Sequence, residues 1–596
     1  MINAIRERIS RLRKYLTLHN LDAFIVPSSD AHISEYTATH WKARTWISGF
    51  TGSAGSAAVT LTRAGLWTDS RYFIQAENEL KETSVELFRV GLPETPDMLE
   101  FLCAELSEGA TVGVDGSVFT VNEVRRIRTL LSKKGINLVT ELDPFKEIWT
   151  DRPALPNDPI FELPDIFAGE TSSAKIEKII SILNKEGANC TILTALDEIA
   201  WTFNIRGTDV ECNPVAVSYA FISQEESILF IELDKLTEEL RETLHAQNIS
   251  FADYHKFSSY LSKLESKSAL HVDPNKVNYA IYESISSDCK IVESTSPVTL
   301  LKSKKNEVEI NGFRNALIKD GVALTKFFIW LDKSIDSGKL TEYTIGKKLL
   351  EFREEQELFF GESFATIAGY ASNGAIVHYS ANEDSAKTLS RNSFLLLDSG
   401  GQYFDGTTDI TRTVSLGTLS DQQKIDYTLV LKGHINIATC RFPEGTRGSQ
   451  IDILARKAMW DRGMNYGHGT GHGIGHFLNV HEGPQSIRMD ENPTKLVPGM
   501  VLSNEPGLYR AGEYGIRIEN LILVKEEEET SFGRFFGFET LTLFPIDTNA
   551  IDLSILNKNE IDWLNDYHHM VFHKLLPHLD SNEVAWLKEK TQAIKG

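Results

Sequence analysis

Residues 1–155 and 156–301 carry the same features in the same order, which indicates a duplicated fold. Each segment opens with an amphipathic helix pattern followed by a short apolar strand, Ala23–Val26 in the first and Cys190–Leu193 in the second. Each strand leads to an Asp-containing turn and then to an aromatic and glycine-containing stretch. Strands that alternate with helices at this spacing are typical of α/β units. We therefore predict two related α/β domains.

Two breaks divide the chain into three predicted domains. The stretch Asp151–Pro159 places three prolines together, which is typical of a linker. A second strand-like run ends near residue 300, and a long charged helix pattern begins near Lys302. With 596 residues in the chain and roughly 100–200 residues per domain, several domains are expected. The predicted domains are 1–155, 156–301 and 302–596, the last with a C-terminal extension.

The third segment combines helix patterns with strands joined by short turns. Apolar residues recur at helical spacing from Ile310 to Leu324, and a further helix pattern covers 449–460. Ser420 and Gln423 form a capping box that opens another helix. Strand patterns lie at 393–398, 408–416, 500–505 and 515–524. We predict an α+β domain whose curved antiparallel sheet is backed by helices.

Composition and charge argue against several classes of function. The formal net charge is −22, which opposes binding to nucleic acid or to an anionic membrane surface, because both rely on clustered Lys and Arg. No apolar run approaches the roughly 20 residues of a membrane-spanning helix, and the start of the chain lacks a signal-peptide layout. The five cysteines are scattered and odd in number, so no disulfide framework is expected. We predict a cytoplasmic protein with no nucleic-acid or membrane partner.

Two aspartates are predicted to meet in a hairpin. The apolar run 394–397 leads into Asp398, and this strand is expected to end there, where the sheet opens to a cavity. The glycines that follow are typical of turns, and the chain returns through Thr408 and Asp409. We therefore expect the carboxylates of Asp398 and Asp409 to lie close together across the strands.

Two glutamates extend the same predicted cluster. In Gly515–Glu519 the side chains alternate with period two, so Arg517 and Glu519 face the cavity while the isoleucines face the other way. Glu505 closes the neighbouring strand just before Pro506. Several acids that converge on one cavity repel each other and raise their pKa values unless a cation is present. A bound divalent metal would resolve that conflict.

A glycine-rich run with three histidines supplies an imidazole ligand. Gly467–His476 alternates glycine with other residues, which opposes a helix and lets the backbone approach a ligand closely. His472 joins the four acids in a set of five. Four carboxylates and one imidazole favour Mn²⁺ or a similar ion over a Cys-rich zinc site, although Zn²⁺ or Co²⁺ is also accepted. Two metals bridged by carboxylates are a usual design for hydrolysis.

The third segment resembles the pita-bread metallopeptidases, and most closely the cytosolic three-domain aminopeptidase P family. The matching motifs are Asp398-Ser-Gly-Gly, Thr408-Asp-Ile-Thr-Arg, Gly469-Thr-Gly-His-Gly-Ile-Gly, Ser503-Asn-Glu-Pro-Gly and Arg517-Ile-Glu-Asn. Further matches in the first half are Ser48-Gly-Phe-Thr-Gly-Ser-Ala-Gly, Trp67-Thr-Asp-Ser-Arg-Tyr and Ala195-Leu-Asp-Glu-Ile-Ala-Trp. The resemblance implies two creatinase-like α/β domains followed by a pita-bread catalytic domain.

The resemblance also implies how two divalent metal ions per chain would be held. Asp398 would chelate one metal. His472 and Glu505 would hold the other. Asp409 and Glu519 would bridge both. The expected metal is Mn²⁺, with Zn²⁺ or Co²⁺ as alternatives.

The remaining roles that the resemblance implies concern substrate and proton transfer. Glu505 would shuttle a proton, and His481 would stabilise the tetrahedral oxyanion. His378 and His468 would contact the substrate or assist proton transfer. Arg517 and Tyr509 would tune Glu519 and the pocket, and Arg517 is expected to pair with Glu519. Arg517 is therefore counted as catalytic and Tyr509 as substrate-binding.

The expected reaction is metal-dependent release of the N-terminal residue from peptides with proline in the second position. Prolidase, which cuts Xaa-Pro dipeptides, shares the metal set and stays open as an alternative. Methionine aminopeptidase needs no two large N-terminal domains, and a creatinase-type enzyme works without metal, so both are disfavoured. An inactive peptide-binding protein would be expected to lack ligands, and none is missing here. The resemblance alone implies a homodimer.

Overall fold

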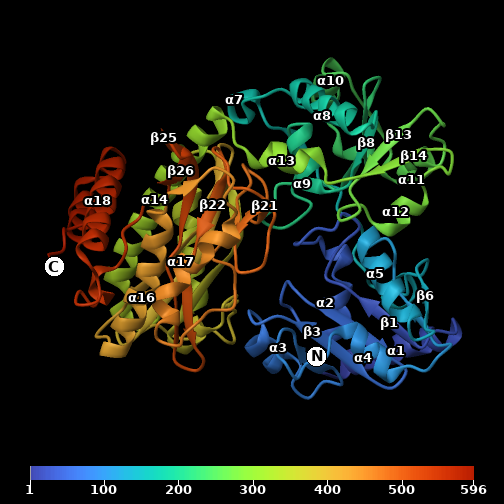
Figure 1. Cartoon of the computed structure of the whole chain (residues 1–596). Coiled ribbons are helices and arrows are strands. Elements are labelled where there is room, and N and C mark those ends of the chain that lie inside the picture. Colours follow the sequence, from blue (N-terminus) through green and yellow to red (C-terminus); the bar gives the residue numbers. More distant parts are fainter. Residues whose placement is uncertain (1, 596) are drawn as a thin grey trace. The chain divides into compact units, whose positions relative to one another are not determined.

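The computed structural model describes residues 2–595, which form two compact units (Figure 1). The first unit comprises the chain up to Pro164 together with Glu170–Thr299. The second comprises Asp165–Gly169 and the chain from Leu300 onward. The domain boundaries near 155 and 301 stay a prediction. No helix among the described residues is both long enough and apolar enough to cross a membrane.

The first unit contains two six-stranded sheets with equivalent strand orders, which confirms the predicted duplication. The first sheet has the order β4 (Glu86–Arg89), β3 (Ala64–Thr68), β2 (Ser56–Thr60), β1 (Ala23–Val26), β5 (Thr111–Gly113) and β6 (Asn137–Val139). The second has the order β12 (Ile249–Ala252), β11 (Ser227–Ile231), β10 (Ser218–Ser223), β8 (Cys190–Leu193), β13 (Ala269–Val272) and β14 (Lys290–Glu293). β1 and β8 are equivalent, since each is antiparallel to one neighbour and parallel to the other.

The opening helices of the two repeats are α1 (Ile2–Leu18) and α8 (Ser172–Glu186). Both bury apolar residues at helical spacing. Thr171 caps the start of α8, and Gly187 ends it in the left-handed conformation that glycine adopts readily. Other helices of this unit include α4 (Met98–Glu105), α5 (Val121–Ser132), α9 (Leu196–Thr202) and α10 (Glu238–Ala246).

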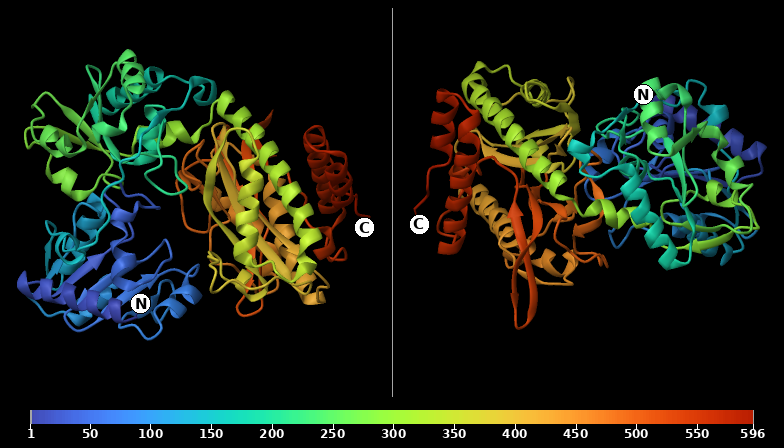
Figure 2. Two further views of the ribbon diagram at one scale, coloured as in Figure 1. Left: turned by 180° about the vertical axis from the view of Figure 1, so that it is seen from behind. Right: turned by 90° about the horizontal axis from the view of Figure 1, so that it is seen from above.

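The second unit is α+β, as predicted, with two antiparallel sheets and a two-stranded ribbon. One sheet contains β15 (Phe359–Tyr370), β16 (Phe394–Tyr403), β17 (Gly406–Thr407) and β18 (Ile410–Ser415). The other has the order β19 (Phe442–Pro443), β26 (Gly533–Thr540), β25 (Asn520–Thr530), β22 (Val501–Asn504), β20 (Gly471–Gly473) and β21 (Glu482–Ile487). The ribbon is β23 (Gly507–Arg510) with β24 (Tyr514–Arg517). The hairpin of β25 and β26 projects well beyond its sheet (Figure 2).

Helices cover the outside of these sheets (Figures 1 and 2). They are α14 (Glu307–Ser334), α15 (Glu342–Glu354), α16 (Asp421–Ala438) and α17 (Gly448–Trp460), and α18 (Lys558–Leu575) and α19 (Ser581–Lys590) pack against α14 in turn. The predicted capping box at Ser420 and Gln423 opens α16. The predicted start of the long helix near Lys302 is wrong, because Asn306 caps α14 and the helix begins at Glu307. α16 packs against α17 and α18, and α17 against β21.

The strand that carries Asp398 is longer than predicted. The prediction ends this strand at Asp398, but β16 continues to Tyr403. A Cβ atom at Gly400 would lie 2.0 Å from the carbonyl oxygen of Thr408. The predicted strand end is therefore wrong, because this glycine lets a neighbouring backbone approach and does not turn the chain.

The predicted strand 515–524 is two strands. β24 ends at Arg517 and pairs with β23, whereas β25 begins at Asn520 and pairs with β22. Between them, the backbone N–H of Glu519 donates to the carbonyl of Thr411 at 3.1 Å. The chain thus changes its pairing partner at Glu519, one of the predicted metal ligands.

Candidate metal centre

Both sheets of the second unit contribute to one cluster of acids and imidazole. Asp398 lies in β16, and Asp409 directly precedes β18. His472 is the middle residue of β20. Glu505 directly follows β22, and Glu519 directly precedes β25. The structure therefore brings the five predicted ligands to the same region from strands far apart in the sequence.

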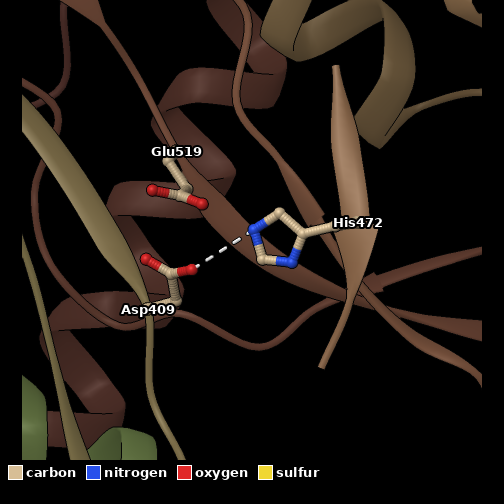
Figure 3. A group of neighbouring side chains, drawn as sticks. All are labelled: Asp409, His472 and Glu519. Carbon is tan, nitrogen blue, oxygen red and sulfur yellow. Dashed lines mark ion pairs between the residues drawn. The ribbon is translucent and has the colours of Figure 1, made fainter. Parts of the chain in front are cut away.

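Asp409, His472 and Glu519 form the tightest part of this cluster (Figure 3). Each offers one ligand atom, and these atoms lie within 4.8 Å of one another. His472 Nε2 lies 3.5 Å from Asp409 Oδ2 and 3.4 Å from Glu505 Oε1. His472 Nδ1 donates to the carbonyl of Gly473 at 3.0 Å, which leaves Nε2 facing the carboxylates. This geometry suits a divalent cation.

Asp409, Glu505 and Glu519 resist ionisation in the absence of a cation. Burial raises the pKa of Asp409 and of Glu519 well above the ordinary carboxyl value, and repulsion among the neighbouring acids adds to it. Burial also raises the pKa of Glu505 to about 7, and the charge of Asp398 contributes to that rise. Arg517 opposes these shifts in all three residues. A bound divalent cation would favour the ionised form of each.

Asp398 provides a direct test of whether a cation fits. Its Oδ2 accepts from Arg517 Nη2 at 2.5 Å, but its Oδ1 is buried and has no hydrogen-bond partner among residues 2–595. A buried carboxylate oxygen without a partner is costly unless a ligand satisfies it. The donor set fits a cation at this oxygen. Arg517 faces the cavity as predicted, and its ion pair is with Asp398 rather than with Glu519.

A hydrogen-bonded chain connects two of the predicted substrate residues to Arg517. Tyr509 OH accepts from Arg517 Nη1 at 2.7 Å and lies 2.8 Å from His468 Nε2. His468 Nδ1 lies 2.7 Å from the carbonyl of Gly469, to which only a protonated nitrogen can donate. The Tyr509 hydroxyl therefore donates to His468 Nε2 when this ring is neutral.

The other two predicted histidines, His481 and His378, lie near different members of the cluster. The ring of His481 packs edge-on against that of His472, with centroids 4.3 Å apart. His378 lies on the loop that follows η5 (Ala371–Ala375), and the carbonyl of its neighbour Val377 accepts from Arg517 Nη2 at 3.4 Å. Both histidines are half-buried.

Two hydroxyl residues that the sequence analysis missed orient the predicted ligands. Thr411 Oγ1 donates to Glu519 Oε2 at 2.8 Å and accepts from Arg517 Nε at 3.1 Å. Ser503 Oγ donates to Glu505 Oε1 at 3.0 Å and accepts from the backbone N–H of His472 at 2.9 Å. Thr411 lies two positions after Asp409, and Ser503 lies two positions before Glu505, in the motifs quoted above. This closeness to predicted ligands is the sequence signal that could have identified both residues.

The glycines around His472 are required by close strand packing. A Cβ atom at Gly471 would lie 2.0 Å from the carbonyl oxygen of Ser503, and one at Gly473 would lie 2.1 Å from that of Glu482. The run forms the short strand β20, so the prediction that it is not helical is confirmed. Small residues here bring β22, which Glu505 follows, and β21, which His481 precedes, close to β20.

Family models match four successive parts of the chain. Two models described as "Creatinase/Prolidase N-terminal domain" match residues 8–147 and 151–309. The model "Metallopeptidase family M24" matches 311–526, and "C-terminal region of peptidase_M24" matches 534–594.

Known proteins resemble the chain over its whole length. A probable Xaa-Pro aminopeptidase P of Coprinopsis cinerea is 40% identical, with 99% of this chain and 98% of that protein covered. Xaa-Pro aminopeptidase 1 of Dictyostelium discoideum is 37% identical, with 99% and 97% covered. The crystal structure of X-prolyl aminopeptidase from Caenorhabditis elegans superposes with a TM-score of 0.95 at 37% identity, covering 99% of this chain and 100% of that one. The nematode protein is described as a cytosolic enzyme with a di-nuclear active site.

Proposed function

The chain belongs to metallopeptidase family M24, in the group of Xaa-Pro aminopeptidases P, and from this membership we propose its reaction. It releases the N-terminal residue from peptides whose second residue is proline. The convergence of Asp409, His472 and Glu519 within 4.8 Å of one another carries the proposal. Similarity to aminopeptidases through both N-terminal domains favours this reaction over the prolidase alternative.

The five clustered residues would hold two divalent metal ions. Asp398 would bind one ion and His472 the other, with Glu505 beside His472. Asp409 and Glu519 would bridge both. When bound, such ions act as Lewis acids on a carbonyl and make water acidic enough to attack at neutral pH.

The chain's own residues would position the peptide and move the proton. Glu505 would accept the proton that the attacking water gives up and pass it to the leaving amine. His481, which packs against His472, would donate to the carbonyl oxygen as negative charge develops on it. His378 and His468 would contact the peptide. Arg517 holds one oxygen of Asp398, and the other oxygen, which has no hydrogen-bond partner among the described residues, would bind the ion.

Hydrolysis of Arg-Pro-Pro, Arg-Pro and Arg-Ala-Pro by metal-stripped protein, with and without Mn²⁺, tests the proposal. Manganese-dependent release of Arg from Arg-Pro-Pro alone is expected. Cleavage confined to the dipeptide Arg-Pro would establish a prolidase. Equal cleavage of Arg-Ala-Pro would remove the requirement for proline, and no cleavage of any peptide with any divalent metal would favour a binding protein.

Mn²⁺ is the proposed metal, supported by the oxygen-rich donor set of four carboxylates and one imidazole. Metal-stripped protein reloaded separately with Mn²⁺, Zn²⁺ and Co²⁺ should show the highest activity with Mn²⁺. Higher activity with Zn²⁺ at equal occupancy would replace this assignment.

We also propose a homodimer that works in the cytosol. The resemblance to aminopeptidases P is what supports dimerisation. The description of the nematode relative as cytosolic supports the location, as do five cysteines that are all free. Sedimentation should give about twice the chain mass of 66.9 kDa, and cell fractionation should recover the protein with cytosolic markers.

A further inference from the structure

A fully buried histidine links the two strands that deliver Glu505 and Glu519. His434, on α16, lies 3.1 Å through Nδ1 from the carbonyl oxygen of Asn504 and 3.1 Å through Nε2 from Asn520 Nδ2. A carbonyl only accepts, so Nδ1 carries the proton and Nε2 accepts from the asparagine amide. Burial and the nearby Arg412 lower the pKa of His434 to about 3, which keeps the ring neutral and suited to both bonds.

The two asparagines occupy the last rung of the ladder before the predicted ligands. Asn504 of β22 pairs directly with Asn520 of β25. Glu505 follows the first, and Glu519 precedes the second. Asn504 Nδ2 returns a hydrogen bond to the carbonyl of His434 at 2.9 Å. The histidine therefore fixes both strands at the point from which their carboxylates reach the metal centre.

Arg412 also holds this region in place. Its Nη1 donates to the carbonyl of Glu519 at 2.6 Å, and its Nη2 donates to Asn520 Oδ1 at 2.8 Å. Its Nε donates to the carbonyl of Pro545 at 2.9 Å, and Nη2 lies 2.7 Å from the carbonyl oxygen of Phe544. These acceptors are carbonyl or amide oxygens, so this buried guanidinium joins several chain segments through its fixed fork of donors.

Tyr567 extends this network into the C-terminal region. It lies on α18, and its hydroxyl accepts from Arg412 Nη2 at 2.8 Å and donates to the carbonyl of Phe544 at 2.8 Å. Asn520 Oδ1 lies 3.4 Å from the same hydroxyl. A continuous set of hydrogen bonds thus runs from α18 through Arg412 and Asn520 to His434.

We propose that His434, Arg412 and Tyr567 are positioning residues for the two-metal centre, and that the C-terminal region supports this centre through Tyr567. The inference rests on the proposed function, because it assumes that Glu505 and Glu519 bind metal. Carboxylate ligands must be held within fractions of an ångström to bind a metal pair tightly. Loosening the Asn504–Asn520 rung displaces both ligands together.

Removal of one hydroxyl on α18 is the sharpest test. Tyr567→Phe keeps the ring and its packing but removes the bonds to Arg412 and to Phe544. Full-length protein with this change should bind Mn²⁺ roughly tenfold more weakly by calorimetry, the scale on which the supports of metal ligands act. At non-saturating metal, electron paramagnetic resonance should show less of the coupled manganese pair.

His568→Leu is the matched control for disturbing α18. His568 is buried beside Tyr567, and its Nε2 accepts from the backbone N–H of Ile546 at 3.1 Å, in the same segment that Arg412 contacts. This variant should be destabilised yet bind Mn²⁺ with wild-type affinity. Equal loss of affinity in both variants would make the effect a general packing defect and overturn the proposal.

Variants of His434 divide the link into its two halves. His434→Asn keeps a donor near the Nδ1 position for Asn504, and His434→Gln keeps an acceptor near the Nε2 position for Asn520. Each should lose part of the Mn²⁺ affinity, and His434→Phe should lose more than either. Wild-type Mn²⁺ affinity in Tyr567→Phe and His434→Phe would refute this inference alone. Failure of the wild-type protein to bind a metal pair would instead refute the proposed function.

Discussion

The carboxylates of Asp409, Glu505 and Glu519 retain protons in the metal-free protein at pH values at which exposed acids are ionised. Burial is the first cause of each raised pKa. Metal binding must therefore release protons at neutral pH. Calorimetry of Mn²⁺ binding at pH 6.5, in buffers of different ionisation enthalpy, should show this release, and the release should decrease as the pH rises through 7. Identical heats in all buffers would contradict it.

The same pKa shifts predict how metal-free protein responds to pH. The pKa of Glu505 is about 7 in the folded protein against 4.5 for an ordinary glutamate. A group whose pKa is higher in the folded protein than in the unfolded protein stabilises the fold at pH values below the unfolded pKa. That stabilisation is lost as the pH rises through the folded pKa. The cost is on the order of 1.4 kcal/mol per pKa unit. The gap in melting temperature between Mn²⁺-loaded and chelator-treated protein should therefore widen from pH 5 to pH 8.

The hydroxyl of Tyr509 joins Arg517 to His468, so its removal should affect catalysis more than metal binding. Tyr509→Phe is expected to lower kcat by roughly tenfold, the scale on which residues behind the metal ligands affect activity, while Mn²⁺ stoichiometry stays unchanged. Tyr514→Phe is the matched control on the same ribbon, because the Tyr514 hydroxyl donates to Asp426 instead. Similar losses in both variants would indicate damage to the ribbon alone.

Residue types could be predicted from the sequence at this site, but their partners could not. Asp398, Asp409, Glu505 and Glu519 stand out because acids rarely interrupt or end apolar strands. The bond between Thr411 and Glu519 joins positions 108 apart in the chain. It depends on which strands pair and on how each side chain is rotated, and no local pattern contains that information.

At the scale of elements, a buried carboxylate on α15 organises the loop that carries His378. Four donors surround Glu342. They are the backbone N–H groups of Tyr370 and Lys387, at 2.7 Å each, and the side chains of Asn373 and Tyr379, at 2.9 Å each. Only an acceptor-only group satisfies all four. The carboxylate of Glu342 therefore holds both ends of this loop.

Glu342→Gln should loosen the loop and raise KM for Arg-Pro-Pro severalfold, with a smaller change in kcat, because one amide N–H would face donors. Glu351→Gln is the matched control, since Glu351 is an exposed residue of the same helix that pairs with Lys348. An unchanged KM in Glu342→Gln would show that the loop does not help to bind the peptide.

Elements with strong periodicity could be predicted, and those defined by close approach could not. β1 and β8 match the predicted strands residue for residue, because short apolar runs bounded by polar residues indicate buried strands. Gly400 instead suggests a turn, although it lies inside β16 against Thr408. A glycine that allows a turn and a glycine that allows close packing look the same in a sequence.

For the molecule as a whole, buried histidines predict sensitivity to acid. Burial lowers the pKa of His568 to about 4. The unfolded chain binds a proton at this residue below about pH 6.5, whereas the folded chain does not until about pH 4. Stability is therefore lost as the pH falls through that window.

His568→Gln should flatten the pH dependence of unfolding by on the order of 1.4 kcal/mol per pH unit between pH 6.5 and 4. Denaturant unfolding at several pH values measures how the free energy of unfolding changes with pH. Chelator-treated protein is used so that loss of metal at low pH does not affect this slope. His569→Gln, at the exposed neighbouring position, is the matched control. A slope that His568→Gln leaves unchanged would assign the acid sensitivity to other groups.

The projecting hairpin has a spectroscopic consequence. β25 starts next to Glu519 and runs without interruption to Thr530, and Phe532 at the tip is 90% exposed. At about 3.3 Å per residue, its 11 residues span roughly 35 Å. A nitroxide label at position 532 would therefore lie at a known distance from a paramagnetic ion in the metal centre. The magnetic interaction between label and ion would show when a paramagnetic ion such as Mn²⁺ is bound and when it has left.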